Sequence, residues 1–438
     1  MFLAYSLLYT VTLFALLPYE YFRRPKDSRQ RWLRERFGFI TLPPATGDSP
    51  LLWIHAVSVG EVFSAIPLIR ELKGRYPSFH IVISTVTDTG QKLARERISD
   101  IAYPVYLPFD LVFVLKGLMK RVKPRIFIAM ETELWPNAFR VLRRAGIPIL
   151  VLNGRISDRS FKGYKKIRFF IKKVVRWVDM FCMQEEVYKE RIQALGADEH
   201  RIRVTGNFKF DTKPSDNIPE WFKSLRGPVI VAGSTHEGEE ELMVSVCMRL
   251  RNEHPELNLI IAPRHPERFQ KVGEMLGAQS LRYIKRSQMT PQSADRGQKE
   301  GNTQQLSGMI IILDTIGELA PAYGVADVAV IGGSFSSHGG HNPLEPAFWA
   351  RPVVCGPHME NFPFIQDFYR EGAALESSAE GLYRVLNELL SSPEKRTAMG
   401  KRARLLYDKK AGAVQKAMAI LERYLNAELP VAKEESLP

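Results

Sequence analysis

The segment best suited to chemistry combines two glycine pairs with polar residues directly after an apolar run. Residues 325–331 form an apolar run interrupted only by Asp327, 332–333 are both glycine, and 339–347 read GGHNPLEPA. A buried strand that ends in glycines and leads into a helix opening with Asn and Pro directs backbone N–H groups at an incoming anion. We therefore expect a nucleotide phosphate here, with Glu345 accepting hydrogen bonds from ribose hydroxyls. The candidate residues are Asn342, Pro343, Leu344 and Glu345. In the alternative, the glycines only make turns and the helix only packs on a sheet.

Two further candidates in the first half of the chain are a glutamate and a lysine that each follow a strand-like run. Glu61 ends the stretch 55–61 (HAVSVGE), and Lys209 lies in 206–211 (GNFKFD). A carboxylate at such a position could take a proton from an acceptor hydroxyl, and a cation could neutralise a phosphate leaving group. For Glu61 the alternative of equal weight is a first-turn helix residue stabilised by the helix dipole. For Lys209 the alternative is an ordinary surface lysine.

A second acidic motif, METELWPN at 130–137, follows the apolar run 126–130. We expect Glu131 or Glu133 to point into a cleft and the other glutamate to cap the helix that begins near Asn137. A purely structural loop is the alternative.

The second half of the chain carries two more candidate turns. Arg264 and His265 follow the strand-like run 257–262, where a guanidinium fork and an imidazole suit an anion. The turn 314–319 follows the run 309–313 and is placed to contact a base through its backbone. Its candidate residues are Ile316, Gly317 and Glu318. The sequence has no GxxxxGK[ST] motif, DxD pair or His/Asp cluster, so we expect neither a P-loop ATPase nor a required metal ion or cofactor.

Charge and cysteine content limit the possible partners and surroundings. The 438 residues carry a formal net charge of +13, which implies an anionic partner such as a nucleic acid, a membrane surface or a phosphorylated substrate. The three cysteines are far apart, without CxxC spacing, and fit a reducing location that faces the cytosol.

The N-terminus indicates a membrane anchor. Residues 1–19 carry no charged side chain, and several arginines follow between 23 and 36. This length just spans a bilayer, and the arginines mark the flank that stays in the cytoplasm. We expect an uncleaved anchor with the remaining chain on the cytoplasmic side. An amphipathic or buried helix is the alternative, because Pro18 and the tyrosines suit the membrane interface.

Apolar strand candidates alternate with helical patterns along the rest of the chain, which predicts two doubly wound parallel α/β domains. The strand candidates are 51–54, 80–84, 126–130, 149–152, 180–183, 229–232, 259–262, 309–313, 328–331 and 352–355. The predicted boundaries are 1–22 for the anchor, 23–210 for an acceptor-binding domain, 211–227 for a linker, 228–426 for a nucleotide-sugar domain and 427–438 for a tail. Ligands bind at the carboxyl ends of such strands, so we expect a cleft where the domains meet. We also expect 285–307 to be a polar surface loop.

A basic, partly aromatic stretch at 161–178 predicts an amphipathic helix. Such a helix could lie on anionic lipid headgroups. The alternatives are a solvated helix packed on the first domain, or RNA binding, although no RNA-binding motif accompanies it.

Taken together, the motifs resemble the 3-deoxy-D-manno-octulosonic acid (Kdo) transferases of lipid A biosynthesis, which are GT-B glycosyltransferases. The blocks that carry the resemblance, in the family's order, are HAVSVGE, METELWPN, NGRISDRS, TGNFKFD, APRHPERF, DTIGEL and GGSF with GGHNPLEPA. They extend over nearly the whole chain.

The resemblance implies transfer of Kdo from CMP-Kdo to a sugar hydroxyl of a lipid A precursor, with inversion and without a metal, at the inner membrane. Glu61 then looks like the general base, and Glu131 and Lys209 resemble a pair that stabilises the transition state. The expected partners are CMP-Kdo, the lipid A precursor and an anionic membrane surface, and no nucleic acid. The alternatives are a UDP-sugar GT-B glycosyltransferase or epimerase, and a non-catalytic membrane-tethered protein that binds anions.

Overall fold

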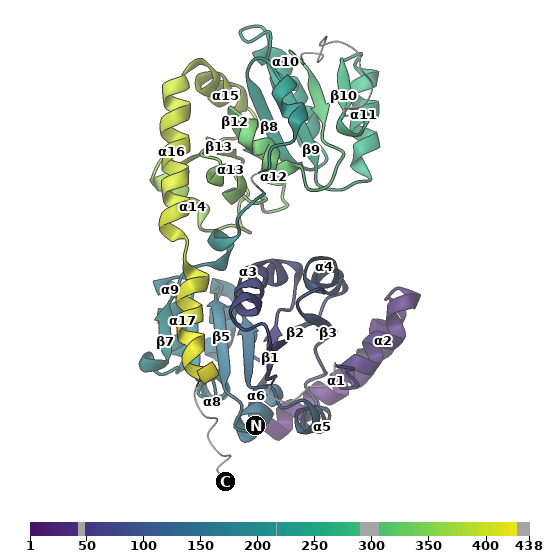
Figure 1. The fold of residues 1–438 in the computed structure, drawn as a ribbon, viewed down its shortest axis with the longest axis vertical. Helices are drawn as coiled ribbons and strands as arrows, with labels where there is room; N and C mark the ends of the chain where they lie inside the picture. Colours follow the sequence, from purple (N-terminus) through teal and green to yellow (C-terminus); the bar gives the residue numbers. More distant parts are fainter. Residues whose placement is uncertain (43–48, 216, 290–305, 427–438) are drawn as a thin grey trace. The chain divides into compact units, whose positions relative to one another are not determined.

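The computed structural model describes residues 1–42, 49–215, 217–289 and 306–426, and it divides into two compact units. The first unit is Met1–Thr212 together with the chain from Lys410 onward, and the second is Lys213–Lys409. Each unit contains a seven-stranded sheet with helices on both faces (Figure 1). The prediction of two doubly wound α/β domains is confirmed.

The sheet of the first unit is parallel throughout, in the order β3-β2-β1-β4-β5-β6-β7. Its strands are β1 (Leu51–His55), β2 (His80–Thr85), β3 (Tyr103–Tyr106), β4 (Ile126–Met130), β5 (Ile149–Gly154), β6 (Met180–Met183) and β7 (Ile202–Val204). The central strands are continuous apolar runs because both of their faces are covered by helices.

Two helical layers enclose this sheet. Side chains from α5, α6, α8 and α9 pack on one face, and side chains from α3, α4 and α17 pack on the other. The helices are α3 (Val59–Arg75), α4 (Asp88–Ile98), α5 (Val112–Val122), α6 (Pro136–Arg144), α7 (Asp158–Lys166), α8 (Arg168–Val175), α9 (Glu186–Leu195) and α17 (Ala413–Asn426), with short 3-10 turns η1 (Glu199–Arg201) and η2 (Phe208–Asp211).

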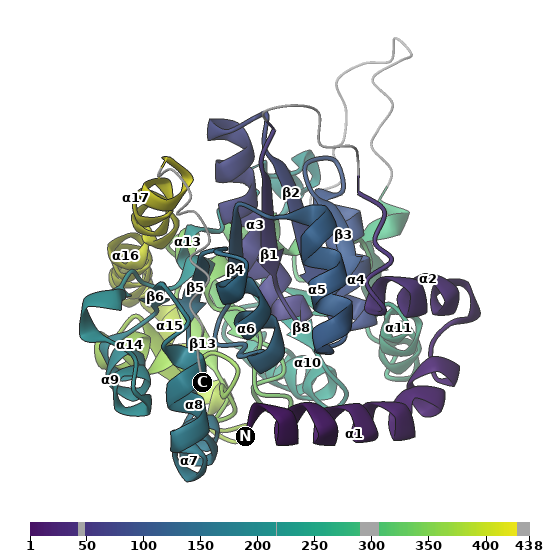
Figure 2. The ribbon, with the colours of Figure 1, turned by 90° about the horizontal axis from the view of Figure 1, so that it is seen from below.

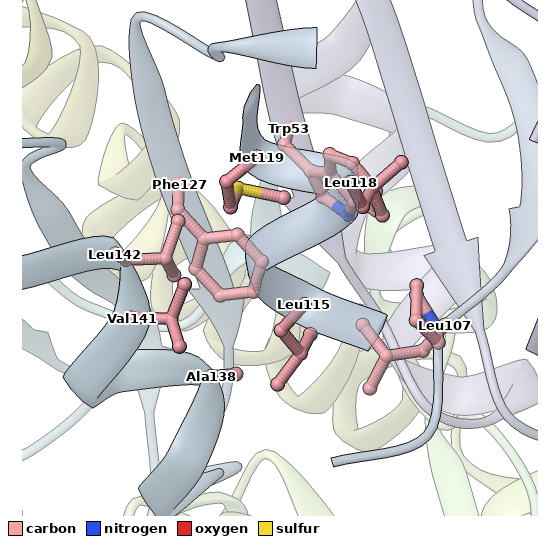
Figure 3. A pocket seen from close by; sticks show the side chains of 10 residues that line it. Trp53, Leu107, Leu115, Leu118, Met119, Phe127, Ala138, Val141 and Leu142 are labelled. Atoms are coloured by element: carbon pink, nitrogen blue, oxygen red, sulfur yellow. The ribbon is translucent and has the colours of Figure 1, made fainter. Parts of the chain in front are cut away.

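A small gap remains in the first of these layers, between α5, α6 and the sheet. Its volume is about 10 Å³, and apolar side chains such as Trp53, Leu115 and Phe127 surround it (Figure 3). It offers no polar group that could hold a substrate, so it is a packing defect of the core.

The sheet of the second unit is also parallel throughout, in the order β10-β11-β9-β8-β12-β13-β14. Its strands are β8 (Val229–Thr235), β9 (Asn258–Pro263), β10 (Tyr283–Lys285), β11 (Ile310–Ile312), β12 (Val328–Ile331), β13 (Val353–Cys355) and β14 (Ala374–Glu376). One face is covered by α10, α11 and α15, and the other by η3, α12 and η5. The helical elements are η3 (Glu220–Ser224), α10 (Glu239–Leu250), α11 (Arg268–Ala278), η4 (Arg286–Gln288), α12 (Leu319–Ala322), η5 (Tyr323–Val325), α13 (Leu344–Phe348), α14 (Ile365–Arg370), α15 (Leu382–Ser391) and α16 (Pro393–Lys410).

The last helix joins the first unit, whereas the sequence placed 228–426 in one domain. Ala417, Met418 and Leu421 of α17 are buried in the same cluster as the inward side chains of α3. Asp211 accepts a hydrogen bond from the Val414 N–H at 2.6 Å. The apolar stripe of α17 thus completes one face of the first sheet. Residues 290–305 of the predicted loop and the tail 427–438 lie outside the described part of the chain.

The N-terminal helices α1 (Phe2–Phe22) and α2 (Lys26–Arg36) precede the first sheet. Within the described residues, α1 is the single helix long and apolar enough to cross a membrane, with a mean hydropathy of 1.6. It runs beside α6 along one side of the first unit (Figures 1 and 2).

The basic stretch 161–178 is not one helix, which corrects the prediction. The chain breaks at Ile167, with φ −116° and ψ 31°, between α7 and α8. The break has a packing reason: Ile171, Val174 and Val175 of α8 are buried in the core, whereas α7 has no buried residue. Part of the apolar pattern of 161–178 therefore packs in the interior of the first unit.

Candidate active site

Glu61 lies in the first turn of α3, and its carboxylate is held on two sides. One oxygen accepts a hydrogen bond from the Val57 N–H at 2.8 Å, and the other accepts from the Ser58 hydroxyl at 3.0 Å. Burial and the negative charges of Glu131 and Glu133 together raise the pKa of the Glu61 carboxyl to about 8, although the two hydrogen bonds lower it. The helix-terminus position of Glu61 is confirmed, and its acceptor-facing role stays a prediction. A carboxyl with this pKa is matched to proton transfer near neutral pH.

Glu131 and Lys209 are brought together in the same unit. Glu131 directly follows β4 with φ +54°, a left-handed conformation that a glutamate rarely adopts. Burial raises the pKa of the Glu131 carboxyl, and the charges of Lys209 and Arg155 lower it. Burial lowers the pKa of the Lys209 ammonium, and Glu131 raises it again. A strained backbone beside buried opposite charges is characteristic of functional sites.

The helix that follows METELWPN is capped by a residue that the sequence analysis did not consider. The Asp110 carboxylate accepts hydrogen bonds from the N–H groups of Asn137 at 3.1 Å and Ala138 at 2.7 Å. Glu133 therefore does not cap α6, which corrects the prediction. Burial and the charge of Glu131 instead raise the pKa of the Glu133 carboxyl.

A polar pocket of about 220 Å³ opens where β4 and β5 end. Its lining residues are Glu131, Thr132, Glu133, Arg155, Ile156, Ser157, Ser160 and Tyr164. Sequence analysis quoted Arg155, Ser157 and Ser160 only as part of the block NGRISDRS. Their proximity to Glu131 depends on the pairing of β4 with β5, which no local pattern encodes.

In the second unit, the backbone donors of the glycine turn are occupied by a side chain of the protein. The Glu239 carboxylate accepts hydrogen bonds from the N–H groups of His236 at 2.9 Å, Gly333 at 2.7 Å and Phe335 at 3.0 Å. These three donors are therefore not available to an incoming phosphate, and the phosphate site at 342–345 stays a prediction. The following helix α13 has five residues, and the Leu344 N–H donates to the Asn342 side chain at 3.1 Å.

Side chains, rather than backbone groups, provide the anion-binding chemistry here. The Nε2 atoms of His236 and His341 are 2.8 Å apart, and the rings of His236 and His338 stack with centroids 3.8 Å apart. Burial, followed by the charge of Arg264, lowers the pKa of His341 to about 4. The His265 ring lies 5.5 Å from His236. Arg264 supplies the positive charge of this cluster, because a pKa of about 4 leaves the His341 imidazole uncharged near neutral pH. Of the imidazoles, the sequence analysis named only His265 as a candidate residue.

Glu345 belongs to the same neighbourhood. Burial raises the pKa of the Glu345 carboxyl, and the Asn342 amide and the charge of Arg264 lower it, with a net value of about 7. The structure thus gathers Arg264, His265, Asn342 and Glu345 at the ends of β9 and β12. Pro343 and Leu344 connect the last two of these along the chain.

The predicted turn 316–318 lies at the end of β11 in a different environment. The Ile316 side chain is 83% exposed. The Glu318 carboxylate pairs with the Arg286 guanidinium at 3.0 Å and accepts from the Trp221 indole at 3.3 Å. No interaction found among the described residues joins this turn to the imidazole cluster. The same part of the chain contains no group of three or more His, Cys, Asp or Glu side chains arranged to hold a metal ion.

Two parallel-sheet units with polar clusters at the carboxyl ends of their strands define a GT-B-type enzyme. A glycosyltransferase from Rickettsia africae has the same fold, with a TM-score of 0.56 at 14% identity over 87% of this chain and 100% of that chain. A UDP-GlcNAc 2-epimerase from Neisseria meningitidis aligns with a TM-score of 0.55 at 12% identity, over 86% of this chain and 100% of that chain. At these identities the likeness shows the fold alone.

The sequence relatives identify a family, whereas the structural likeness identifies only the fold. The family model described as 3-deoxy-D-manno-octulosonic-acid transferase (kdotransferase) matches residues 31–212. A 3-deoxy-D-manno-octulosonic acid transferase of Haemophilus influenzae is 36% identical over 409 residues, covering 91% of this chain and 92% of its own length. The chain therefore belongs to the Kdo transferase family. The predicted family, its enzyme class and Kdo transfer in lipopolysaccharide synthesis are confirmed.

Proposed function

We propose that the protein transfers Kdo from CMP-Kdo to a sugar hydroxyl of a lipid A precursor, with inversion at the sugar carbon and without a metal ion. The observation that carries this proposal is the grouping of Glu61, Glu131 and Lys209 in one unit of a Kdo transferase family member. The charge of Glu131 acts on Glu61, and Glu131 and Lys209 act on each other. These interactions support a proton acceptor that works together with a buried acid and a cation.

In the proposed step, the acceptor oxygen attacks the anomeric carbon of Kdo while its proton passes to the Glu61 carboxylate. The bond from that carbon to the phosphate oxygen breaks, and CMP leaves with the electron pair. Lys209 and Glu131 stabilise the charge that develops during transfer. Arg264 and the imidazole cluster of the second unit bind the phosphate, and Asn342 and Glu345 bind the nucleoside.

The test is incubation with CMP-Kdo and a tetraacylated lipid A precursor, followed by mass spectrometry of the products. Glu61→Gln should reduce product formation by at least about 100-fold, as expected for loss of a general base, while CMP still raises the melting temperature. Glu71→Gln is the matched control, because Glu71 lies on the same helix and pairs with Arg75 at the surface. Wild-type rates in Glu61→Gln would remove Glu61 from the mechanism. Stabilisation by UDP and not by CMP would favour a UDP-sugar enzyme.

We further propose that the protein acts at the cytoplasmic face of the inner membrane, with α1 lying in the membrane surface. The N-terminal half of α1 supports this orientation because its polar side chains contact the folded unit. The Tyr5 hydroxyl donates to Asp110 at 2.8 Å, and the Ser6 hydroxyl donates to Asn137 at 3.0 Å. The Phe2 ring lies 4.9 Å from the Phe170 and Trp177 rings.

The C-terminal end of α1 is held as well, because Arg24, just beyond it, pairs with Asp88. These contacts at both ends support a helix that stays along its own domain and does not cross the bilayer. The opposite side of α1 stays exposed and apolar, with Leu3 84%, Leu7 68% and Val11 60% exposed. Such a face suits the boundary between headgroups and acyl chains.

Labelling of a single introduced cysteine tests this orientation, since the three native cysteines are buried. Leu3→Cys should be protected from a membrane-impermeant maleimide in sealed vesicles of either orientation, and it should react once the membrane is dissolved. Reaction from the outer face of the membrane would show that α1 spans the bilayer.

A further inference from the structure

We propose that the pocket at the ends of β4 and β5 is a subsite for an anionic sugar, in which the Arg155 guanidinium holds the phosphate or carboxylate group. This inference rests on the proposed function, because it names the part of a substrate that the first unit recognises. Glu131 and Arg155 both line this pocket, and Glu61, the group assigned to proton transfer, is not among its lining residues.

The backbone around the pocket is fixed. The Arg155 N–H donates to the Thr132 hydroxyl oxygen at 3.0 Å, which joins the segments that follow β4 and β5. The Ser157 hydroxyl oxygen caps α7 by accepting from the Ser160 N–H at 3.2 Å. The guanidinium therefore extends from a supported loop that lies next to the positive end of a nine-residue helix.

The remaining lining suits a sugar ring. The Ser160 and Tyr164 hydroxyls both donate and accept hydrogen bonds, and the Glu133 carboxyl accepts them from ring hydroxyls. The volume of about 220 Å³ is below the roughly 300–1,000 Å³ of pockets that enclose drug-sized ligands. It therefore matches one sugar ring with one charged substituent and is too small for a nucleotide-sugar.

The charge balance allows an anion despite the two glutamates. Glu131 is offset by Lys209 and Arg155, which both act on its carboxyl. Burial raises the pKa of the Glu133 carboxyl, so its negative charge opposes a bound anion less than that of an ordinary glutamate. The Arg155 guanidinium then provides the charge that a bidentate phosphate or carboxylate contact requires.

The anionic group could come from a phosphate of the acceptor lipid or from the carboxylate of Kdo. Arg155→Gln is measured by steady-state kinetics with both substrates varied, and by direct binding of the acceptor in detergent micelles without donor. We expect a 10- to 100-fold rise in one of the two KM values, the range for loss of a charge-assisted contact. A rise in acceptor KM that disappears with an acceptor lacking one phosphate identifies phosphate. A rise in donor KM with unchanged acceptor binding identifies the carboxylate.

Arg159→Gln is the matched control, because Arg159 is an exposed arginine four residues further along, in the first turn of α7. Tyr164→Phe removes one hydroxyl, and we expect a 3- to 10-fold rise in the same KM even if Arg155→Gln folds poorly. Values within twofold of Arg159→Gln for both variants would overturn the proposal. Binding of the acceptor that depends on Arg155, in a protein that forms no Kdo product, would support the pocket and refute the proposed function instead.

Discussion

Replacing Glu239 with alanine should destabilise the glycine turn that follows β12 in the second unit. The Glu239 carboxylate accepts from three backbone N–H groups and from the Ser336 hydroxyl at 3.2 Å, and its side chain is 3% exposed. It connects the first turn of α10 with the segment that follows β12. The same carboxylate thus shapes the region in which we place the nucleotide phosphate.

The expected cost follows from the donors that the mutation leaves behind. Two of the hydrogen bonds, to the N–H groups of His236 and Gly333, are buried. An unsatisfied buried donor costs about 1–3 kcal/mol, so the two together cost about 3–4 kcal/mol once partial hydration is allowed. For a domain of this size, 1 kcal/mol corresponds to about 2–4 °C in Tm, so we expect the transition to fall by about 6–16 °C. Glu239→Gln keeps one acceptor oxygen, and we expect about half of that loss.

Thermal unfolding followed by circular dichroism measures the loss of stability, and the same measurement with added CMP shows whether the protein still binds the nucleotide. Glu241→Ala is the matched control, because Glu241 lies two residues further along α10, is exposed and accepts one hydrogen bond from the Gly238 N–H at 3.0 Å. We expect less than about 1 kcal/mol for this control. A Glu239→Ala protein that melts within 2 °C of it and still binds CMP would refute the reasoning.

Three other predictions concern the pH dependence of activity and stability set by Glu61, the glycine at position 332 and the Asp110 cap of α6. Glu61 must be deprotonated to act, so activity should rise with pH through its pKa of about 8, and Glu133→Gln, which removes a negative charge, should move this rise to lower pH. Because that pKa lies above the unfolded value of about 4.3, stability should fall as pH increases between the two values, and Glu61→Gln should flatten this dependence. Gly332→Ala would place a Cβ atom 2.3 Å from the Ser234 carbonyl oxygen, so we expect a loss of about 3 kcal/mol by denaturant titration. Asp110→Asn weakens the cap of α6 and the contact with Tyr5, and we expect about 2 kcal/mol from the same titration.

Each of these has an outcome that contradicts it. If the midpoint of the activity rise with pH is unchanged in Glu133→Gln, the charge of Glu133 does not affect the pKa of Glu61. A Gly332→Ala protein with wild-type stability would show that β8 and β12 separate easily at their ends. Asp110→Asn with an unchanged midpoint would mean that the cap and the α1 contact contribute nothing.

The sequence predicted the central strands of both sheets and missed all four edge strands of the described structure, β3, β7, β10 and β14. Central strands are buried on both faces and therefore read as apolar runs. The edge strands have three or four residues and partly exposed side chains, and β3 contains Pro104. Local composition does not distinguish such segments from loops.

The sequence determined the family and the positions of the main candidate residues. Each motif is a short local stretch that follows a strand, and the motifs occur in the order typical of the family. The tertiary structure alone decided what those residues contact. It showed that Glu239 fills the glycine turn, that Asp110 caps α6, and that α1 lies along its own domain. It also joined Arg155 to Glu131 through the pairing of β4 with β5. These contacts connect residues far apart in the chain, so they depend on sheet order and side-chain packing, which a linear pattern does not contain.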